Sequence, residues 1–172
     1  MPAGQDEEAD GRSTRDVWTV CANSAVRRAA RRLGQLYDDA IAPSGLRGTQ
    51  FSLLAQIRRL GEPALQPLAA AIVMDLSALG HTLKPLQRDG LVALAPDPAD
   101  RRVKRVSLTP LGHARLAEAE AMWRAAQRRF EHLVGADDAA ALSRILGTIA
   151  SDDFRDAFER EASSSAGPAG GS

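Results

Sequence analysis

The stretch 83–112, LKPLQRDGLVALAPDPADRRVKRVSLTPLG, decides the fold of this chain. It begins as the end of a helix that Asp89-Gly90 closes, because glycine readily takes the left-handed backbone found at helix C-termini. Two short strands, Leu91–Ala95 and Val103–Leu108, then flank a link too polar and proline-bearing for a core. Thr109-Pro110 has the residue types that open a new helix. The stretch therefore predicts a projecting β-hairpin between two helices.

Helices are predicted on both sides of the hairpin, from apolar residues that recur at spacings of three and four. They cover about 17–41, 47–60, 65–72 and 75–88 before it. After it, one helix runs from Pro110 to a break at Gly135, and a last helix is capped by Asp137 and extends to Phe158. Aromatic residues make up only 4% of the chain, which also disfavours an all-β fold. We expect a mainly α fold with a small β-hairpin wing.

The predicted organisation is one domain between two tails. Residues 1–15 are polar and acidic and 162–172 are rich in Ser and Gly, so both are expected to be disordered. Within the domain, 16–161, a reader of about 47–110 is flanked by long helices over about 17–41 and 110–160. Because those helices carry apolar seams that need a partner, they are expected to form a homodimer.

Charge and composition exclude several classes of protein. The 22 basic and 22 acidic residues cancel, so a strongly basic nucleic-acid coat is excluded, although residues 101–105 (RRVKR) form a local basic site. The single cysteine rules out an intrachain disulfide, and no apolar run is long enough to span a membrane. We expect a cytoplasmic protein that does not bind membranes.

Chemistry-bearing motifs are missing from the sequence. It has no nucleotide-binding glycine loop, no HExxH and no plausible nucleophile-base pair. His113 and His132 have no further ligand-type neighbours at metal-binding spacing. No enzyme activity, cofactor or metal is expected.

The order of elements resembles the MarR-type winged helix-turn-helix regulators over roughly residues 17–155. The segment Gly45–Leu54 (GLRGTQFSLL) is similar to the start of the family's second helix. More specific are Leu83–Val92, with its GLV entry into the wing, the acid-x-Arg tip at Asp100–Arg102, and the LT-x-x-G helix start within Val106–Gly112. The resemblance implies a winged helix-turn-helix core flanked by dimerisation helices.

The helix from Asp75 to Arg88 is the expected recognition helix, with Asp75 as N-cap. The major groove admits a helix that carries short or hydrogen-bonding side chains on its outer face. Leu79, Leu83 and Leu86 can anchor the helix inward. The candidates for DNA contact are Ser77, Ala78, Gly80, His81 and Lys84. The chain departs from the commoner family pattern, which has Thr and Arg at the positions of Gly80 and His81.

In the wing, the resemblance implies that Asp100 braces the hairpin through an ion pair with a nearby arginine. It also implies that Arg102 reaches the minor groove, where a narrow groove attracts guanidinium groups. Arg101, Lys104 and Arg105 are interpreted as phosphate contacts, which position a protein without reading sequence. The alternative is that this charge run is only solvated surface.

Two further features suggest regulation. Cys21 is a candidate redox sensor, because some relatives detect oxidants with a cysteine near the start of this helix, but a small apolar filler is the alternative. Four aromatic residues are candidates for an effector pocket between the long helices and the reader, although plain core is their commoner role. They are Trp18, Tyr37, Phe51 and Trp123.

The sequence thus predicts a sequence-specific DNA-binding regulator, a repressor, that binds double-stranded DNA as a homodimer on a pseudo-palindromic operator. A small-molecule effector or an oxidant would release it. The alternative is a helical-dimer module that binds a ligand or a partner and has lost DNA binding. Salt separates the two, because DNA affinity falls steeply as salt rises.

Overall fold

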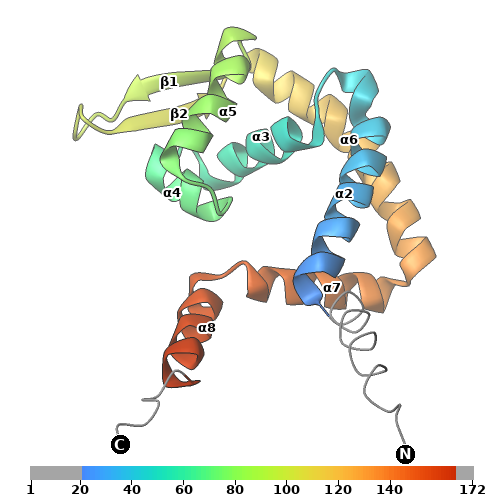
Figure 1. The fold of residues 1–172 in the computed structure, drawn as a ribbon. Coiled ribbons are helices and arrows are strands. Elements are labelled where there is room, and N and C mark those ends of the chain that lie inside the picture. The colour runs from blue at the N-terminus through green and yellow to red at the C-terminus, as the bar shows by residue number, and fades with distance from the viewer. Residues whose placement is uncertain (1–20, 166–172) are drawn as a thin grey trace, which may run out of the picture.

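The computed structural model describes residues 21–165, which fold mainly into helices with one two-stranded hairpin (Figure 1). The predicted fold class is confirmed. In chain order the elements are α2 (Ala22–Ile41), the short 3-10 helix η1 (Ala42–Ser44), α3 (Gly48–Leu60), α4 (Leu65–Ala71), α5 (Leu76–Arg88), β1 (Val92–Pro96), β2 (Lys104–Leu108), α6 (Pro110–Val134), α7 (Ala136–Ile149) and α8 (Asp152–Ser165).

The core lies where α3, α4 and α5 pack against the base of the hairpin and the start of α6. Strands β1 and β2 pair antiparallel, with Val92 opposite Leu108 and Pro96 opposite Lys104. The predicted anchors of α5 are buried, and on α3 the buried residues include Phe51, Leu54 and Ile57. The side chains that are almost wholly buried include Leu54, Ile57, Leu68, Leu79, Leu83, Leu86, Val106 and Leu116.

Helix starts and stops follow the predicted capping residues at most positions. The Asp75 carboxylate accepts the backbone N–H of Ala78 at 2.7 Å, and the Thr109 hydroxyl accepts that of Gly112 at 3.0 Å. Gly90 takes a positive φ of 70° just beyond α5, and Gly135 separates α6 from α7. These caps are local interactions between near neighbours, so sequence alone places them.

The C-terminal end differs from the prediction of one helix capped by Asp137 and reaching Phe158. Gly135 is the N-cap of α7, and Asp137 lies within its first turn. A new helix then begins after Ser151, whose hydroxyl accepts the N–H of Phe154 at 3.2 Å. Helix α8 continues to Ser165, past the predicted start of the tail at Ala162. The predicted N-terminal tail, residues 1–15, lies outside the described residues.

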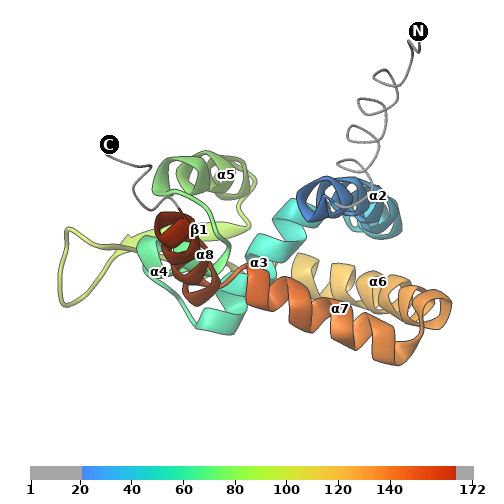
Figure 2. The same cartoon turned by 60° about the horizontal axis from the view of Figure 1, so that its bottom comes forward.

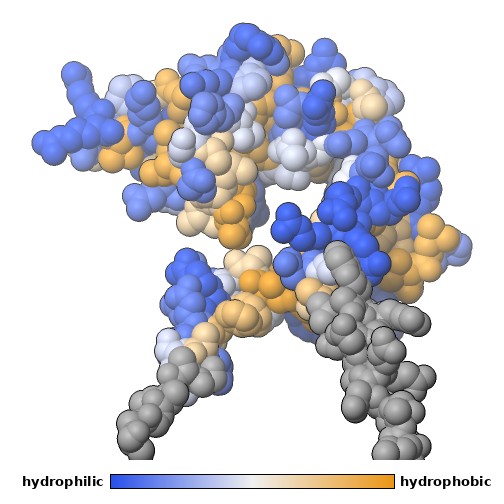
Figure 3. Space-filling view, in the orientation of Figure 1, coloured by the Kyte–Doolittle hydropathy of each residue, from blue (hydrophilic) through white to orange (hydrophobic). Residues whose placement is uncertain are grey.

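The end helices leave much apolar surface uncovered. Leu133, near the end of α6, is 82% exposed, and Phe158 on α8 is 68% exposed. Figure 3 shows hydrophobic residues gathered over α7 on the face it displays. The exposed apolar residues of α7 and α8 are Leu142, Ile145, Leu146, Ile149, Phe154 and Phe158. None of the helices among residues 21–165 combines the length and apolar character of a membrane span.

The first turn of α6 lies directly against Leu91, three residues after the end of α5. A Cβ at Gly112 would stand 2.0 Å from the Leu91 carbonyl oxygen, so this position needs glycine. We expect Gly112→Ala to cost about 2 kcal/mol or more of unfolding free energy, because backbone must move. Gly80→Ala, where no atom lies within 4 Å, should instead stabilise α5 by about 0.5–1 kcal/mol.

Thermal denaturation at one protein concentration checks both substitutions. The midpoint should fall by several degrees for Gly112→Ala and rise slightly for Gly80→Ala. Equal midpoints for the two variants would contradict the close approach at Leu91.

Candidate nucleic-acid interface

Helix α5 presents one face to the core and the opposite face to solvent. Leu79 and Leu86 are completely buried and Leu83 nearly so, which fixes the helix by its inner face. Ser77, His81 and Lys84 are exposed, while Ala78 and Gly80 are half-buried at its flanks. Gly80 has open space beside its Cα. The outer face is therefore low in relief and could approach a surface closely.

The candidate contact residues of α5 are uncommitted within residues 21–165. Ser77, His81 and Lys84 make no side-chain hydrogen bond or ion pair there. The sequence interpretation overlooked Arg88, which lies four residues after Lys84 and so shares its face. Its side chain is 76% exposed and pairs only with Asp89. The spacing of four was the signal that could have identified it.

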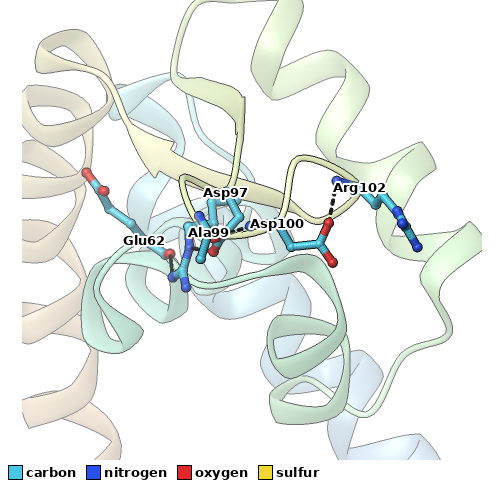
Figure 4. A network of polar contacts seen from close by, with 6 residues as sticks. Glu62, Asp97, Ala99, Asp100 and Arg102 are labelled. Atoms are coloured by element: carbon cyan, nitrogen blue, oxygen red, sulfur yellow. Dashed lines mark hydrogen bonds and ion pairs between the residues drawn. The ribbon is translucent and has the colours of Figure 1, made fainter.

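The hairpin is held against the reader by one buried carboxylate, Asp97. It accepts the backbone N–H groups of Ala99 at 2.7 Å and Asp100 at 3.2 Å, and it forms an ion pair with Arg105. Arg105 also donates to the Glu62 carbonyl at 2.9 Å (Figure 4). Beside it, the Val106 N–H donates to the Pro63 carbonyl at 3.0 Å. The base of the wing is thus attached to the segment between α3 and α4.

The ion pair expected for Asp100 is wrong. Among residues 21–165 Asp100 pairs with no arginine; its carboxylate accepts the backbone N–H of Arg102 at 3.0 Å and so shapes the tip. The bracing acid is Asp97, because the chain turns back there and brings it beside Arg105 on β2. Arg105 therefore braces the wing through Asp97 and the Glu62 carbonyl. Its predicted contact with a phosphate stays a prediction.

The Arg105 guanidinium, together with the N–H groups of Ala99 and Asp100, lowers the pKa of Asp97 below its ordinary value. A carboxylate with a depressed folded pKa stabilises the fold above its unfolded pKa. That contribution disappears as the pH falls through the folded value. The wing brace is therefore fully charged at neutral pH and weakens only under acid conditions.

Three cations at the wing tip have no polar partner among residues 21–165. Arg101, Arg102 and Lys104 are exposed, and their side chains make no hydrogen bond or ion pair there. In Figure 4 the Arg102 side chain projects away from the Asp97 turn. Both overall views place the hairpin and α5 in the part of the molecule away from α7 (Figures 1 and 2). Local basic charge is therefore concentrated on the outer side of the reader.

A cavity of about 590 Å³ lies between the long helices and the reader. Three of the four predicted aromatic residues line it, with the Phe51 and Trp123 rings stacked at 6.0 Å between centroids. The Tyr37 hydroxyl donates to Gln127 on α6 at 2.7 Å. Other lining residues come from the turn before α5 and from α5 itself, namely Ile72, Met74 and Thr82. The cavity thus touches both the long helices and the recognition helix.

The remaining candidates are less constrained by the structure. Trp18 lies outside the described residues. Cys21 is the half-buried N-cap residue of α2, and its thiol is not in a disulfide. Within residues 21–165, no cluster of three or more metal-ligating side chains is present.

A three-helix unit that exposes one helix face beside a cationic hairpin defines a winged helix-turn-helix DNA-binding protein. The sequence model of the MarR family matches residues 46–104. The DNA complex of the M. tuberculosis transcriptional regulator MosR is 41% identical, with a TM-score of 0.69, over 76% of this chain and 93% of that one. The chain belongs to the MarR family of transcriptional regulators.

Other solved structures share the fold. The transcriptional repressor CouR, bound to a 23-mer DNA duplex, is 27% identical over 78% of this chain and 96% of its own, with a TM-score of 0.72. CouR from Rhodococcus jostii RHA1 is also known bound to p-coumaroyl-CoA. A mutant MarR from E. coli, complexed with operator DNA, is 22% identical over 77% of this chain and 96% of its own, with a TM-score of 0.70.

The two wing carboxylates should differ sharply when removed. Asp97→Ala leaves Arg105 without its partner and releases two backbone N–H groups, so the hairpin should loosen and DNA affinity should fall several-fold. Asp100→Ala removes one exposed hydrogen bond and should change affinity less than twofold. Fluorescence anisotropy measures the affinities, and amide hydrogen exchange of 92–108 reports the loosening. Equal losses for both variants would contradict the bracing role of Asp97.

Proposed function

We propose that this chain is a sequence-specific transcriptional repressor that binds a pseudo-palindromic operator as a homodimer and is released by a small-molecule effector. One observation carries the proposal: the candidate side chains on the outer face of α5 and at the wing tip make no hydrogen bond or ion pair with the part of the chain that the structure describes. Ser77, Ala78, Gly80, His81 and Lys84 are assigned to the major groove. Arg102 is assigned to the minor groove, and Arg101 and Lys104 to phosphates.

The uncovered apolar faces of the end helices support the homodimer. The short helix α7 exposes more apolar side chains than an isolated subunit in water usually does. They are those of Leu142, Ile145, Leu146 and Ile149. A two-fold dimer would bury these residues against their copies. It would also place two α5 helices about one DNA turn apart, roughly 34 Å, as a pseudo-palindrome requires.

The position of the cavity supports release by an effector. Its walls combine α2 and α6 with the turn that precedes α5 and with Thr82 on α5. A ligand that fits only one arrangement of these elements would favour that arrangement over the DNA-bound one. A second route is oxidation of Cys21, whose half-buried thiol lies at the start of α2 and is in no disulfide.

Selection of bound fragments from random DNA with the purified chain tests the proposal and returns the operator. We expect a two-fold related pair of half-sites to be enriched. Enrichment without symmetry would overturn the homodimer arrangement. No enrichment at low salt would overturn DNA binding and favour the ligand- or partner-binding module.

Removing the side chain of Arg102 should weaken operator binding about tenfold and reduce the dependence of affinity on salt. Arg160→Ala is the matched control, because it removes the same charge from α8, whose main packing partner is α7. Anisotropy titrations at several salt concentrations measure both effects. Unchanged affinity for Arg102→Ala at moderate salt would count against the wing assignment.

A further inference from the structure

The cavity between α2, α3 and α6 has mostly apolar walls with aromatic rings on two sides. Phe51 and Trp123 stack on each other, and Tyr37 faces the same space from α2. Aromatic faces carry partial negative charge, so they attract cations as well as flat apolar groups. Burial, with the nearby charge of Glu131, raises the pKa of the Tyr37 phenol, which therefore stays neutral at physiological pH.

One charged residue, Asp38, completes these walls. It lies near the end of α2, and its Oδ1 accepts the N–H of Gly48, the first residue of α3. Among residues 21–165 it is the only charged side chain that lines the cavity, since no Lys, Arg or His of that range is a lining residue. Within residues 21–165 Asp38 forms no ion pair with a basic group. Its charge therefore acts on whatever occupies the cavity.

Asp38 also occupies the position that an anionic ligand would otherwise take. The free N–H groups and the dipole at a helix N-terminus attract anions, and α3 begins at this wall. That place is already filled by the Asp38 carboxylate, which lies so close that a Cβ at Gly48 would be 2.8 Å from Oδ1. A carboxylate ligand entering here would meet a like charge and would have to displace it.

We propose that this cavity binds flat apolar ligands that carry a positively charged nitrogen, and that Asp38 sets this preference for cations. The aromatic walls hold the ring system, and the Asp38 carboxylate pairs with the nitrogen. The inference rests on the proposed function only in taking the cavity as the effector site. Because the carboxylate also holds the start of α3, the ligand nitrogen and the Gly48 N–H share one acceptor.

Three probes of one shape and different charge test the preference. They are naphthylmethylammonium, naphthalenemethanol and naphthoate, titrated into the full chain without DNA and followed by calorimetry. We expect the ammonium to bind about tenfold more tightly than the neutral alcohol. The carboxylate should bind most weakly. Naphthoate binding as tightly as the ammonium would overturn the proposal.

Substitutions at two adjacent carboxylates make the test specific. Asp38→Asn removes the charge but keeps an oxygen that can accept the Gly48 N–H, so it should abolish the preference for the ammonium. Asp39→Asn is the matched control, because Asp39 is the next residue of α2 and does not line this cavity. It should leave the preference intact. A preference that survives Asp38→Asn would overturn the role of Asp38.

The same titrations separate this inference from the proposed function. Equal binding of all three probes, abolished by Trp123→Ala, would overturn the charge preference and leave the cavity as a ligand site. Binding of none of them, by a chain that still binds its operator, would overturn both the preference and the effector site. Loss of operator binding alone would overturn the regulator and leave the cation preference standing.

Discussion

The contact on which the architecture depends is the backbone approach between the end of the recognition helix and the start of α6. Gly112 lies against the Leu91 carbonyl, and the same oxygen accepts the N–H of Thr109. The Thr109 hydroxyl meanwhile donates to the carbonyl of Gly90 and accepts the N–H of Gly112. Neither side of this junction can shift without breaking backbone hydrogen bonds. The direction of α6 and the direction of α5 are therefore fixed together.

This junction joins the long helix α6 firmly to the reader. In the proposed homodimer, the long helices can therefore set the spacing of the two readers on DNA. Leu116 and Ala119, on the first turns of α6, are completely buried in the core that also holds α5. An ion pair between Arg58 and Glu120 ties α3 to the same helix. Since α6 is joined to the reader by backbone and core, a change in how two α6 helices meet in the proposed homodimer would move the reader with them. Rigid-body motion is one of the established ways in which an interface transmits a switch.

Much of this fold could be predicted from sequence because local interactions fix it. The caps at Asp75 and Thr109 and the glycines at the ends of α5 and α6 act on their immediate neighbours.

The bracing carboxylate was misassigned because both Asp97 and Asp100 lie in one short loop. Only the folded turn decides which of them meets Arg105. Asp38 was overlooked for the same reason, since its partner, Gly48, belongs to a different helix. The separation of α8 from α7 depends on Ser151, whose capping role competes with helix continuation and is ambiguous in sequence.

Because Asp38 lies at the cavity wall and contacts the start of α3, ligand binding in the proposed effector site would be coupled to the conformation of the DNA reader. A ligand changes the balance of two conformations only as far as its affinity for them differs. A ligand that bound the cavity walls equally in both arrangements would therefore not release DNA, however tightly it bound. The Asp38 carboxylate would supply such a difference, because a cation that shares it with the Gly48 N–H favours the arrangement in which Asp38 holds the start of α3. Thr82 would supply a second difference in affinity. It lines the cavity from α5, and its hydroxyl donates to the carbonyl of Ala78 on the same helix. A ligand at this wall would thus be separated from the outer face of α5, the face proposed to contact DNA, by the width of a single helix.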